Sequence, residues 1–108
     1  MGFRIRATPL ALSDIDESVQ YYIREGSPDV AAKWLDGIVS TVLSLREMPK
    51  RCPLASESED LEFEVRQILY KSHRVVFHVA GSGDGGEVHV LRVYHQARRA
   101  LTLADLDV

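Results

Sequence analysis

The chain has 108 residues, of which 45% are hydrophobic and 27% are charged, and its formal net charge is −3 at pH 7. This length predicts a single domain over residues 1–108, with a core large enough to need no disulfide or metal for stability. The apolar fraction excludes an intrinsically disordered chain, and the negative net charge excludes a polycation that binds nucleic acid over its whole surface.

The first predicted element is a short strand near the N-terminus. Residues 3–7 alternate between apolar and basic side chains, so that Phe3, Ile5 and Ala7 fall on one face. Alternation of this kind is typical of an extended segment that buries one face.

A helix is predicted to follow at once. Thr8 suits the N-cap and Pro9 the first helical position, while Gly26 is expected to end the helix in the left-handed C′ conformation. The apolar stripe of this helix consists of Leu12, Ile15, Val19, Tyr22 and Ile23. The opposite, polar face is expected to carry Asp14, Glu17 and Arg24.

Ser27 and Pro28 repeat the same start signal, so a second helix is expected after a very short turn. Two helices joined in this way form an antiparallel hairpin. The second apolar stripe consists of Ala31, Trp34, Leu35, Ile38, Val42 and Leu45. Gly37 lies inside this helix at a cost of up to about 1 kcal/mol relative to alanine, which a close helix crossing would explain. Pro49 is expected to end the helix.

The second half of the chain predicts strands. Residues 49–62 are polar, contain two prolines and show no period, so we expect a surface loop. Strand-like runs follow at 63–70, 73–80 and 87–94, and the last two flank the glycine-rich turn at 81–86. Strands joined by such short connections form an antiparallel meander.

These elements predict an α+β fold in which an N-terminal strand and an antiparallel helical hairpin pack on a small antiparallel sheet. The pattern does not say where the first strand pairs. The tail from Ala97 to Leu106 has apolar residues at a spacing compatible with a short C-terminal helix.

A basic group on the sheet is the strongest candidate for function. Residues 64–99 hold six basic and three acidic residues, a net charge of +3. Arg66, Arg74 and Arg92 fall on successive strands, and His95 follows the last strand. Neighbouring strands lie about 4.8 Å apart, so these side chains are expected to converge on an anionic partner. The alternative is pairing across strands with Glu62, Glu64 or Glu87.

Other chemistries find little support in the sequence. The four histidines (His73, His78, His89 and His95) form no helical pair and join no carboxylate cluster, so no metal and no cofactor are expected. Cys52 is the single cysteine, which excludes an internal disulfide, and no catalytic partner lies near it in the sequence. The glycine-rich turn lacks the Lys-Ser/Thr pair of a phosphate-binding loop.

The chain has no apolar run near the roughly 20 residues that a membrane span needs. Its N-terminus also lacks the apolar core of a signal peptide. We therefore expect a soluble cytoplasmic protein without a membrane partner.

Several segments together resemble the RelE/ParE superfamily of toxins from bacterial type II toxin–antitoxin modules. They are the first helix with Asp14-Ile15 and Tyr21-Tyr22, the stretch from Ala31 to Leu45 with Met48-Pro49, the strands from Val65-Arg66 through His73–Val79, and the run from Val90 to Arg99 with its His-x-x-Arg ending. The resemblance follows nearly the whole chain in order. It implies the superfamily's fold, growth inhibition, a role in plasmid stabilisation, and a hetero-oligomer with a cognate antitoxin of the ParD/RelB type that covers apolar grooves and basic residues.

The activity implied by the resemblance differs between two branches. RelE-like members are ribosome-dependent mRNA endonucleases. Arg74 matches the arginine that stabilises the cleaved phosphate, and His95 matches a histidine that acts as acid or base. ParE-like members are not enzymes and poison DNA gyrase by binding.

We favour the ParE-like branch, because Gln96 replaces a tyrosine that follows the histidine in nucleases and because the chain is acidic. The expected partner-binding residues are Arg66, Arg74, Arg92, His95, Arg98 and Arg99. An mRNA endonuclease that uses Arg74 and His95 remains the alternative, and a member that binds antitoxin without toxicity is a third.

Overall fold

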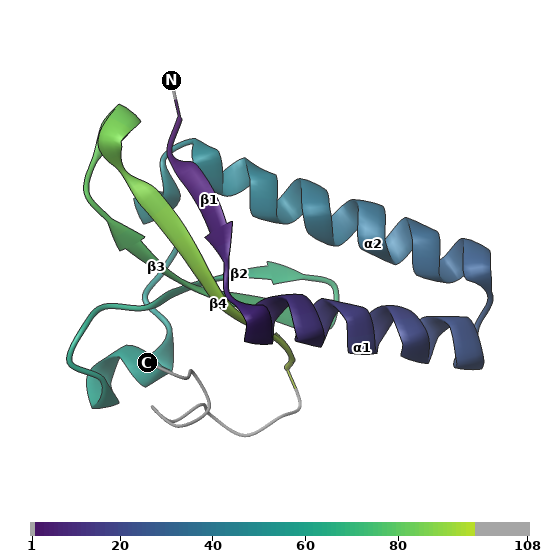
Figure 1. Ribbon diagram of the computed structural model, residues 1–108. Coiled ribbons are helices and arrows are strands. Elements are labelled where there is room, and N and C mark those ends of the chain that lie inside the picture. The colour runs from purple at the N-terminus through teal and green to yellow at the C-terminus, as the bar shows by residue number, and fades with distance from the viewer. Residues whose placement is uncertain (1, 97–108) are drawn as a thin grey trace.

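The computed structural model describes residues 2–96 of the chain (Figure 1). The C-terminal helix expected between Ala97 and Leu106 lies outside the described residues, as do Arg98 and Arg99. The main elements are β1 (Arg4–Ala7), α1 (Pro9–Glu25), α2 (Pro28–Leu43), β2 (Arg66–Tyr70), β3 (His73–Ala80) and β4 (Glu87–His95).

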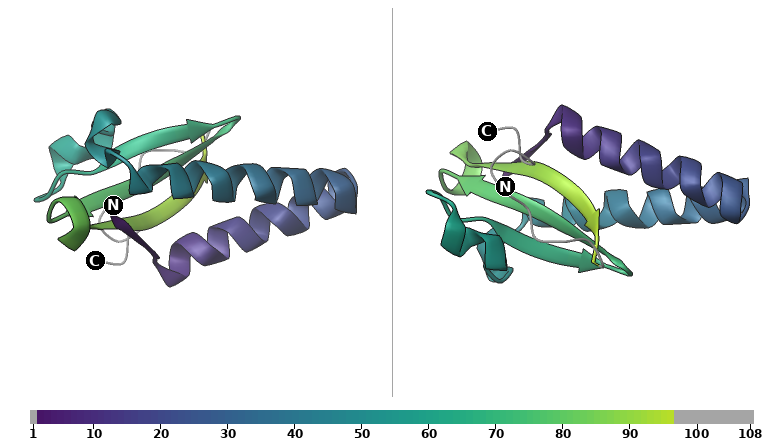
Figure 2. Two further views of the ribbon diagram at one scale, coloured as in Figure 1. Left: turned by 90° about the horizontal axis from the view of Figure 1, so that it is seen from above. Right: turned by 90° about the horizontal axis from the view of Figure 1, so that it is seen from below.

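The predicted α+β fold is confirmed. The helices α1 and α2 form a hairpin that covers one face of the sheet and projects beyond its end (Figures 1 and 2). The sheet has four strands in the order β1-β4-β3-β2. Strands β2, β3 and β4 form the predicted antiparallel meander.

The first strand makes the sheet mixed rather than purely antiparallel. Strand β1 pairs parallel with β4, with Arg4 opposite Glu87 and Ala7 opposite Val90. Parallel pairing needs a long connection, and here the helical hairpin and the first two strands of the meander supply it. The expectation of an antiparallel meander is therefore confirmed, and the structure adds the parallel pairing of β1, which the sequence pattern left open.

Both helix starts and the end of α1 at Gly26 agree with the sequence, whereas the backbone conformation of Gly26 and the end of α2 differ from it. Thr8 Oγ1 accepts a hydrogen bond from Ala11 N at 3.0 Å, and Ser27 Oγ accepts one from Val30 N at 3.2 Å. Gly26 ends α1 at φ −122° and ψ −105°, so the predicted left-handed conformation is wrong. Ser27, the next residue, must already be extended to cap α2, and this requirement limits the backbone conformation of Gly26.

The second helix, unlike the first, ends earlier than predicted. Helix α2 stops at Leu43, and the 3₁₀ turn η1 (Ser44–Arg46) follows it, so Pro49 does not end the helix. The tighter turn brings Leu45 into the core, where its side chain is fully buried.

The segment predicted as a surface loop instead covers the second face of the sheet. It contains the 3₁₀ turns η2 (Pro49–Arg51) and η3 (Ser56–Asp60). A small second core packs beneath it, consisting of Ala55, Val65, Val76, Leu91 and Tyr94. Because Val65 O accepts a hydrogen bond from Ala55 N at 2.8 Å, β2 begins at Arg66 rather than at residue 63.

The main core lies between the hairpin and the sheet, with Trp34 and Ile38 from α2 against Val75, Phe77 and Val90. The α1 stripe is rotated from its predicted position. Leu12 and Ile23 are 57% and 41% exposed, while Ala11 and Asp14 are buried. Asp14 therefore does not lie on the polar face to which the sequence pattern assigned it.

Gly37 marks the closest approach of α2 to β2. A Cβ atom at this position would lie 1.8 Å from Tyr70 Oη. We expect Gly37→Ala to lower the free energy of unfolding by about 1–3 kcal/mol through overpacking, despite alanine's better helix propensity. Urea unfolding of four proteins would measure this: wild type, Gly37→Ala, Tyr70→Ala and the double variant. The cost of Gly37→Ala should largely vanish in the Tyr70→Ala background, and an equal cost in both backgrounds would contradict the crowding.

Candidate functional site

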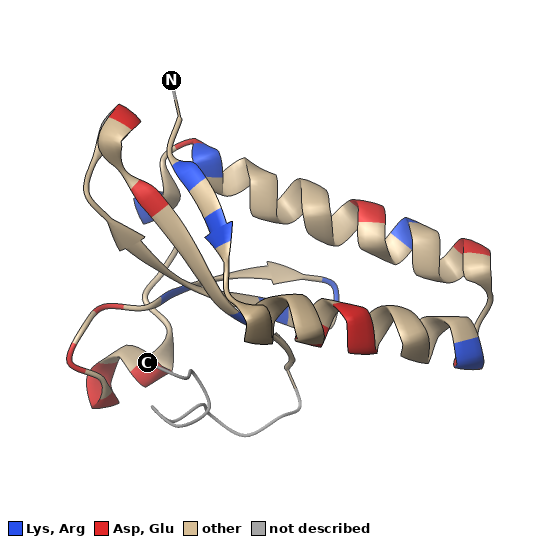
Figure 3. Cartoon of the chain, in the orientation of Figure 1, with Lys and Arg blue, Asp and Glu red and all other residues tan. Residues whose placement is uncertain are grey.

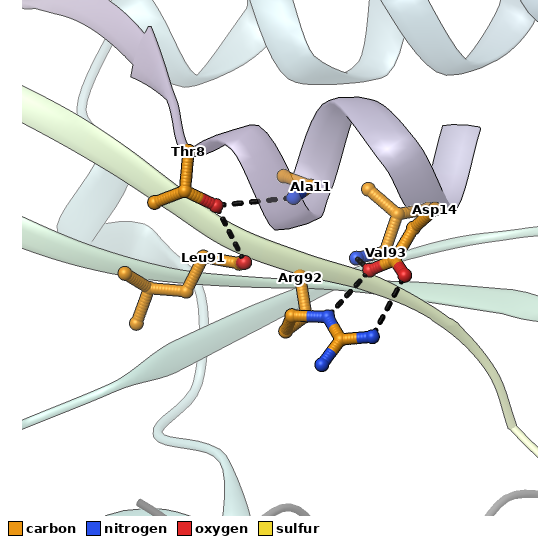
Figure 4. Close-up of polar contacts among 6 residues, drawn as sticks. All are labelled: Thr8, Ala11, Asp14, Leu91, Arg92 and Val93. Atoms are coloured by element: carbon orange, nitrogen blue, oxygen red, sulfur yellow. Dashed lines mark hydrogen bonds and ion pairs between the residues drawn. The ribbon is translucent and has the colours of Figure 1, made fainter. Parts of the chain in front are cut away.

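The site begins beyond the end of β1, where helix α1 takes the place of a paired strand along β4. Strand β1 ends at Ala7, and Thr8 then bonds to the next carbonyls of β4. Thr8 N donates to Val90 O at 3.0 Å, and Thr8 Oγ1 donates to Leu91 O at 2.9 Å (Figure 4). The N-cap residue thus fastens the start of α1 to the edge of β4.

Asp14 continues this attachment nearly two turns further along α1. Its carboxylate accepts hydrogen bonds from Arg92 Nε at 2.7 Å and Arg92 Nη2 at 2.8 Å, and from Val93 N at 2.9 Å (Figure 4). The side chains of Asp14 and Arg92 are 5% and 12% exposed. Beyond the end of β1, the backbone N–H groups on this side of β4 have no neighbouring strand and need another acceptor. This explains why an acidic residue of α1 faces the sheet here.

Arg74 is held by a second buried carboxylate, Glu57 of η3, in the segment that covers the second face of the sheet. Its guanidinium donates from Nη1 to Glu57 Oε1 at 2.9 Å and from Nη2 to Glu57 Oε2, and Nη1 also donates to Gln67 Oε1 at 3.1 Å. Both side chains are nearly buried, with Glu57 at 1% and Arg74 at 11% exposure. The hydrogen bonds to Glu57 raise the pKa of Arg74 above its ordinary value.

The strand register brings two of the three predicted arginines to the same face. Arg74 lies opposite Tyr94, and Val76 lies opposite Arg92. The Arg92 guanidinium carbon is 4.7 Å from the centroid of the Tyr94 ring, a cation–π contact.

Arg66 does not join this pair of arginines. It lies opposite Phe77, and its Nη1 donates to Cys52 O at 2.7 Å. Its Nη2 pairs with Glu64 at 3.6 Å, one of the acids that the sequence offered, but this acid lies two residues away on the same segment and not across a strand. Convergence of all three arginines is therefore wrong.

The carboxylates that hold Arg74 and Arg92 were not among the partners expected from the sequence. In the sequence, Glu57 belongs to an acidic run that is expected to be solvated. Asp14 belongs to the expected polar face of the first helix. Both side chains are brought in by tertiary packing, so the expectation that Arg74 and Arg92 lie on the sheet surface is wrong. Their role in binding a partner stays a prediction.

His95 lies at the end of β4 beside a pocket of about 430 Å³. The pocket is lined from α1 and from the ends of β3 and β4 by Asp14, Glu17, Ser18, Tyr21, Tyr22, His73, Val93 and His95. These described lining residues include two carboxylates but no lysine or arginine. The ring centroids of His73 and His95 are 5.4 Å apart. We call this feature the α1 pocket.

His73 forms the deep wall of the α1 pocket. The residue is 5% exposed, and its ring packs 5.1 Å from the Trp34 ring, measured between centroids. Its Nε2 lies 3.4 Å from Ser18 Oγ, while its buried Nδ1 has no hydrogen-bond partner within the described chain. Burial lowers the pKa of His73 below its ordinary value, and the neighbouring His95 lowers it further.

The lowered pKa of His73 predicts a pH dependence of stability. In the unfolded chain, His73 binds a proton near its ordinary pKa of 6.5. In the folded chain, burial disfavours the protonated ring. The contribution of neutral His73 to the free energy of unfolding is therefore fully present above that pH, and it is lost as the pH falls below it. Urea midpoints measured from pH 8 to pH 5 should fall with pH, and they should fall less in His73→Gln. Equal slopes for the two proteins would contradict the assignment to His73.

Further findings concern the reactivity of Cys52, metal binding and membrane spans. Cys52 is buried, and this burial raises the pKa of its thiol, which leaves it less reactive. Over residues 2–96, no three or more His, Cys, Asp or Glu side chains gather in a way that would hold a metal ion, and no helix is long and apolar enough to span a bilayer.

Sequence reasoning missed most of the α1 pocket. Asp14, Ser18, Tyr21 and Tyr22 recur at intervals of four, three and one residues, which places them on one helical face. That face carries polar atoms on aromatic and small side chains, and this pattern was the available signal. The contribution of His73 depends on strand register, which the sequence did not show.

Comparison with known proteins gives a consistent result. The model of the family described as the ParE toxin of the type II toxin–antitoxin system parDE matches residues 5–100. No curated protein matches the chain significantly. Solved structures that share the fold include the following two.

The first of these structures is a chromosomal ParDE toxin–antitoxin system from P. aeruginosa. It has a TM-score of 0.70 and 23% identity, and the match covers 86% of this chain and 95% of that one. The second is a YoeB/ParE toxin from Agrobacterium tumefaciens, with a TM-score of 0.53, 16% identity, and coverage of 86% and 98%. At these identities the likeness concerns the fold alone.

Proposed function

The chain belongs to the ParE toxins of type II toxin–antitoxin systems, and we propose that it inhibits bacterial growth by binding DNA gyrase rather than by cleaving RNA. In this proposal the protein holds gyrase on cleaved DNA, acts in the cytoplasm, and is neutralised in a hetero-oligomer with its cognate antitoxin. A role in plasmid stabilisation follows from the same pairing of toxin and antitoxin.

One observation carries the choice between binding and cleavage: Arg74, the arginine that a nuclease would use, is already bound to a carboxylate, and so is Arg92. Arg74 is held by Glu57 and Arg92 by Asp14, each in a nearly buried pair. Cleavage of a phosphodiester requires cations aimed at the charge that develops on the phosphate. A guanidinium that is neutralised inside the protein does not supply this stabilisation.

The surroundings of His95 also favour binding. The described side chains that line its pocket include Asp14 and Glu17 and no cation. A phosphate placed there would be repelled by the Glu17 carboxylate. Gln96, which stands in place of a nuclease tyrosine, instead ties the strand end to the β2–β3 turn through Nε2 donating to Lys71 O at 3.1 Å.

Exposed apolar side chains on the hairpin support a bound antitoxin. Leu35, Val39 and Leu43 recur every four residues along α2 and are 37%, 44% and 47% exposed. A contiguous apolar stripe on so small a protein is typical of a surface that a partner covers.

Controlled induction of the lone chain in bacteria tests the proposal. We expect a DNA-damage response and arrested replication, with protein synthesis declining only later. Immediate arrest of translation with cleaved mRNA would instead support the endonuclease alternative. Unimpaired growth with full expression would support the non-toxic alternative and would contradict the proposed function.

His95 separates the two activities most directly. If the chain were a nuclease, His95→Ala would reduce cleavage by about a hundredfold or more, because a general acid or base would be lost. In the proposed gyrase mechanism the histidine lies at a strand end without a chemical role, so the variant should inhibit growth nearly as strongly as the wild type. Growth curves after induction, with immunoblots to match protein levels, measure this difference.

A further inference from the structure

We propose that the α1 pocket is a cage for a cationic side chain, and that its occupant is an arginine of the antitoxin. The identity of the partner rests on the proposed neutralisation by an antitoxin. The chemistry of the pocket rests only on the described residues that line it.

Four of the eight residues that line the pocket carry rings: two tyrosines on α1 and two histidines from the sheet. The Tyr21 and Tyr22 rings meet edge to face with centroids 5.4 Å apart, and Tyr22 lies 6.4 Å from His73. His95 completes the wall on the opposite side. Aromatic faces carry negative potential and attract cations placed within about 6 Å of the ring centroid. Tyr21 is 52% exposed, so part of its ring is available to a ligand.

The charges of the lining select a cation over an anion. Asp14 is already compensated by Arg92, with a distance of 2.7 Å between Oδ2 and Nε. Glu17 is exposed, and no ion pair joins it within residues 2–96. Within residues 2–96, the lining therefore holds one carboxylate that no cation pairs with, beside the aromatic rings, and acidic residues are visible along the middle of α1 (Figure 3).

Guanidinium fits this combination better than ammonium does. It is planar, so it stacks on an aromatic ring while its edge donates two parallel hydrogen bonds to a carboxylate. Ammonium is a compact and strongly hydrated charge that must lose more water to enter such a pocket. A volume of about 430 Å³ leaves room for a guanidinium together with its aliphatic stem.

The position of the pocket favours a protein segment as the source of the arginine. The hairpin projects past the end of the sheet, so α1 overhangs the ends of β3 and β4 where His73 and His95 lie (Figures 1 and 2). Tyr21 is exposed and lines the pocket on α1, so a partner segment can reach its ring. A partner segment that packs against this ring would present an arginine to the carboxylate of Glu17.

The chemistry is tested with the free toxin, prepared from its complex by unfolding, separation and refolding. Nuclear magnetic resonance would follow a titration with N-acetyl-arginine amide. We expect saturable shifts confined to amides of residues 14–22 and 93–95, with a dissociation constant of about 1 mM or weaker, as suits one side chain. The neutral isostere N-acetyl-citrulline amide should bind about fivefold more weakly or not at all. Equal shifts with both compounds would overturn the proposal.

Two matched variants locate the binding. Glu17→Gln should weaken binding of the arginine compound about fivefold or more, since it removes the uncompensated charge. Glu25→Gln makes the same change near the end of α1, at a residue that does not line the pocket, and should leave binding unchanged. Unaltered binding in Glu17→Gln, or equal losses in both variants, would contradict the cage.

The same titration on the intact toxin–antitoxin complex tests the occupant. If an antitoxin arginine fills the pocket, the arginine compound should produce no shifts in the complex. Shifts equal to those of the free toxin would overturn the assignment to the antitoxin. Sedimentation of the free chain as a dimer that the arginine compound dissociates would also overturn it, because the occupant would then be a second copy. None of these measurements involves gyrase, so their failure is distinct from failure of the proposed function.

Discussion

Glu57→Gln is expected to lower the free energy of unfolding by about 3–5 kcal/mol, the range typical of removing one partner from a buried ion pair. The variant leaves the Arg74 guanidinium enclosed without its countercharge, under a segment that covers the second face of the sheet. Urea unfolding followed by circular dichroism measures the loss. The cost remains below the 5–15 kcal/mol that typically stabilises a domain, so a folded variant is expected.

A control on the same 3₁₀ turn isolates the ion pair. Glu59 is exposed, so Glu59→Gln should change the free energy of unfolding by no more than about 0.5 kcal/mol. Replacing both partners, in Glu57→Leu with Arg74→Met, should recover most of the loss, since no buried charge then lacks a partner. Equal stabilities for Glu57→Gln and Glu59→Gln would show that the pair is solvated.

Asp14→Ala is the second change with a large expected effect, about 2–4 kcal/mol. It removes the acceptor of the Arg92 guanidinium and of Val93 N at once, and so detaches α1 from the edge of β4. Asp14→Asn should cost less, because its amide oxygen still accepts one of these hydrogen bonds. Thermal and urea unfolding measure both variants.

The neighbouring acid on α1 provides the comparison for Asp14. Asp16 is exposed, and Asp16→Ala should leave stability within about 0.5 kcal/mol of the wild type. If Asp14→Ala and Asp16→Ala were equally mild, α1 would not depend on this carboxylate for its attachment.

These two ion pairs change how mutations of Arg74 and Arg92 should be interpreted. On the sequence alone, both arginines were expected to serve binding more than folding. Because each is enclosed with a carboxylate, loss of toxicity in Arg74→Ala would first report loss of folded protein. The double variant Glu57→Leu with Arg74→Met removes this ambiguity, since it keeps the fold while removing the guanidinium.

The sequence predicted the elements well where local chemistry decides them. The Thr8-Pro9 and Ser27-Pro28 pairs marked both helix starts, because capping depends on residues within one turn. The glycine-rich turn correctly separated β3 from β4. These features required no knowledge of distant contacts.

Features that depend on distant contacts were not predictable in the same way. The parallel place of β1 beside β4 brings together segments about 80 residues apart, and the alternation of residues 3–7 is the same for either direction of pairing. The partners of Arg74 and Arg92 lie on separate elements that meet only in the folded chain. An acidic residue on a helix or loop carries no local mark that distinguishes burial from exposure.

The central claim is that this ParE-family toxin acts by binding to gyrase. It is tested most directly by incubating the purified chain with purified gyrase, plasmid DNA and ATP, alongside translating ribosomes supplied with mRNA. If the chain binds gyrase, gyrase-dependent cleaved DNA should accumulate with wild type and with His95→Ala alike, while the mRNA stays intact. Ribosome-dependent cleavage of mRNA that disappears in His95→Ala, with gyrase unaffected, would contradict it.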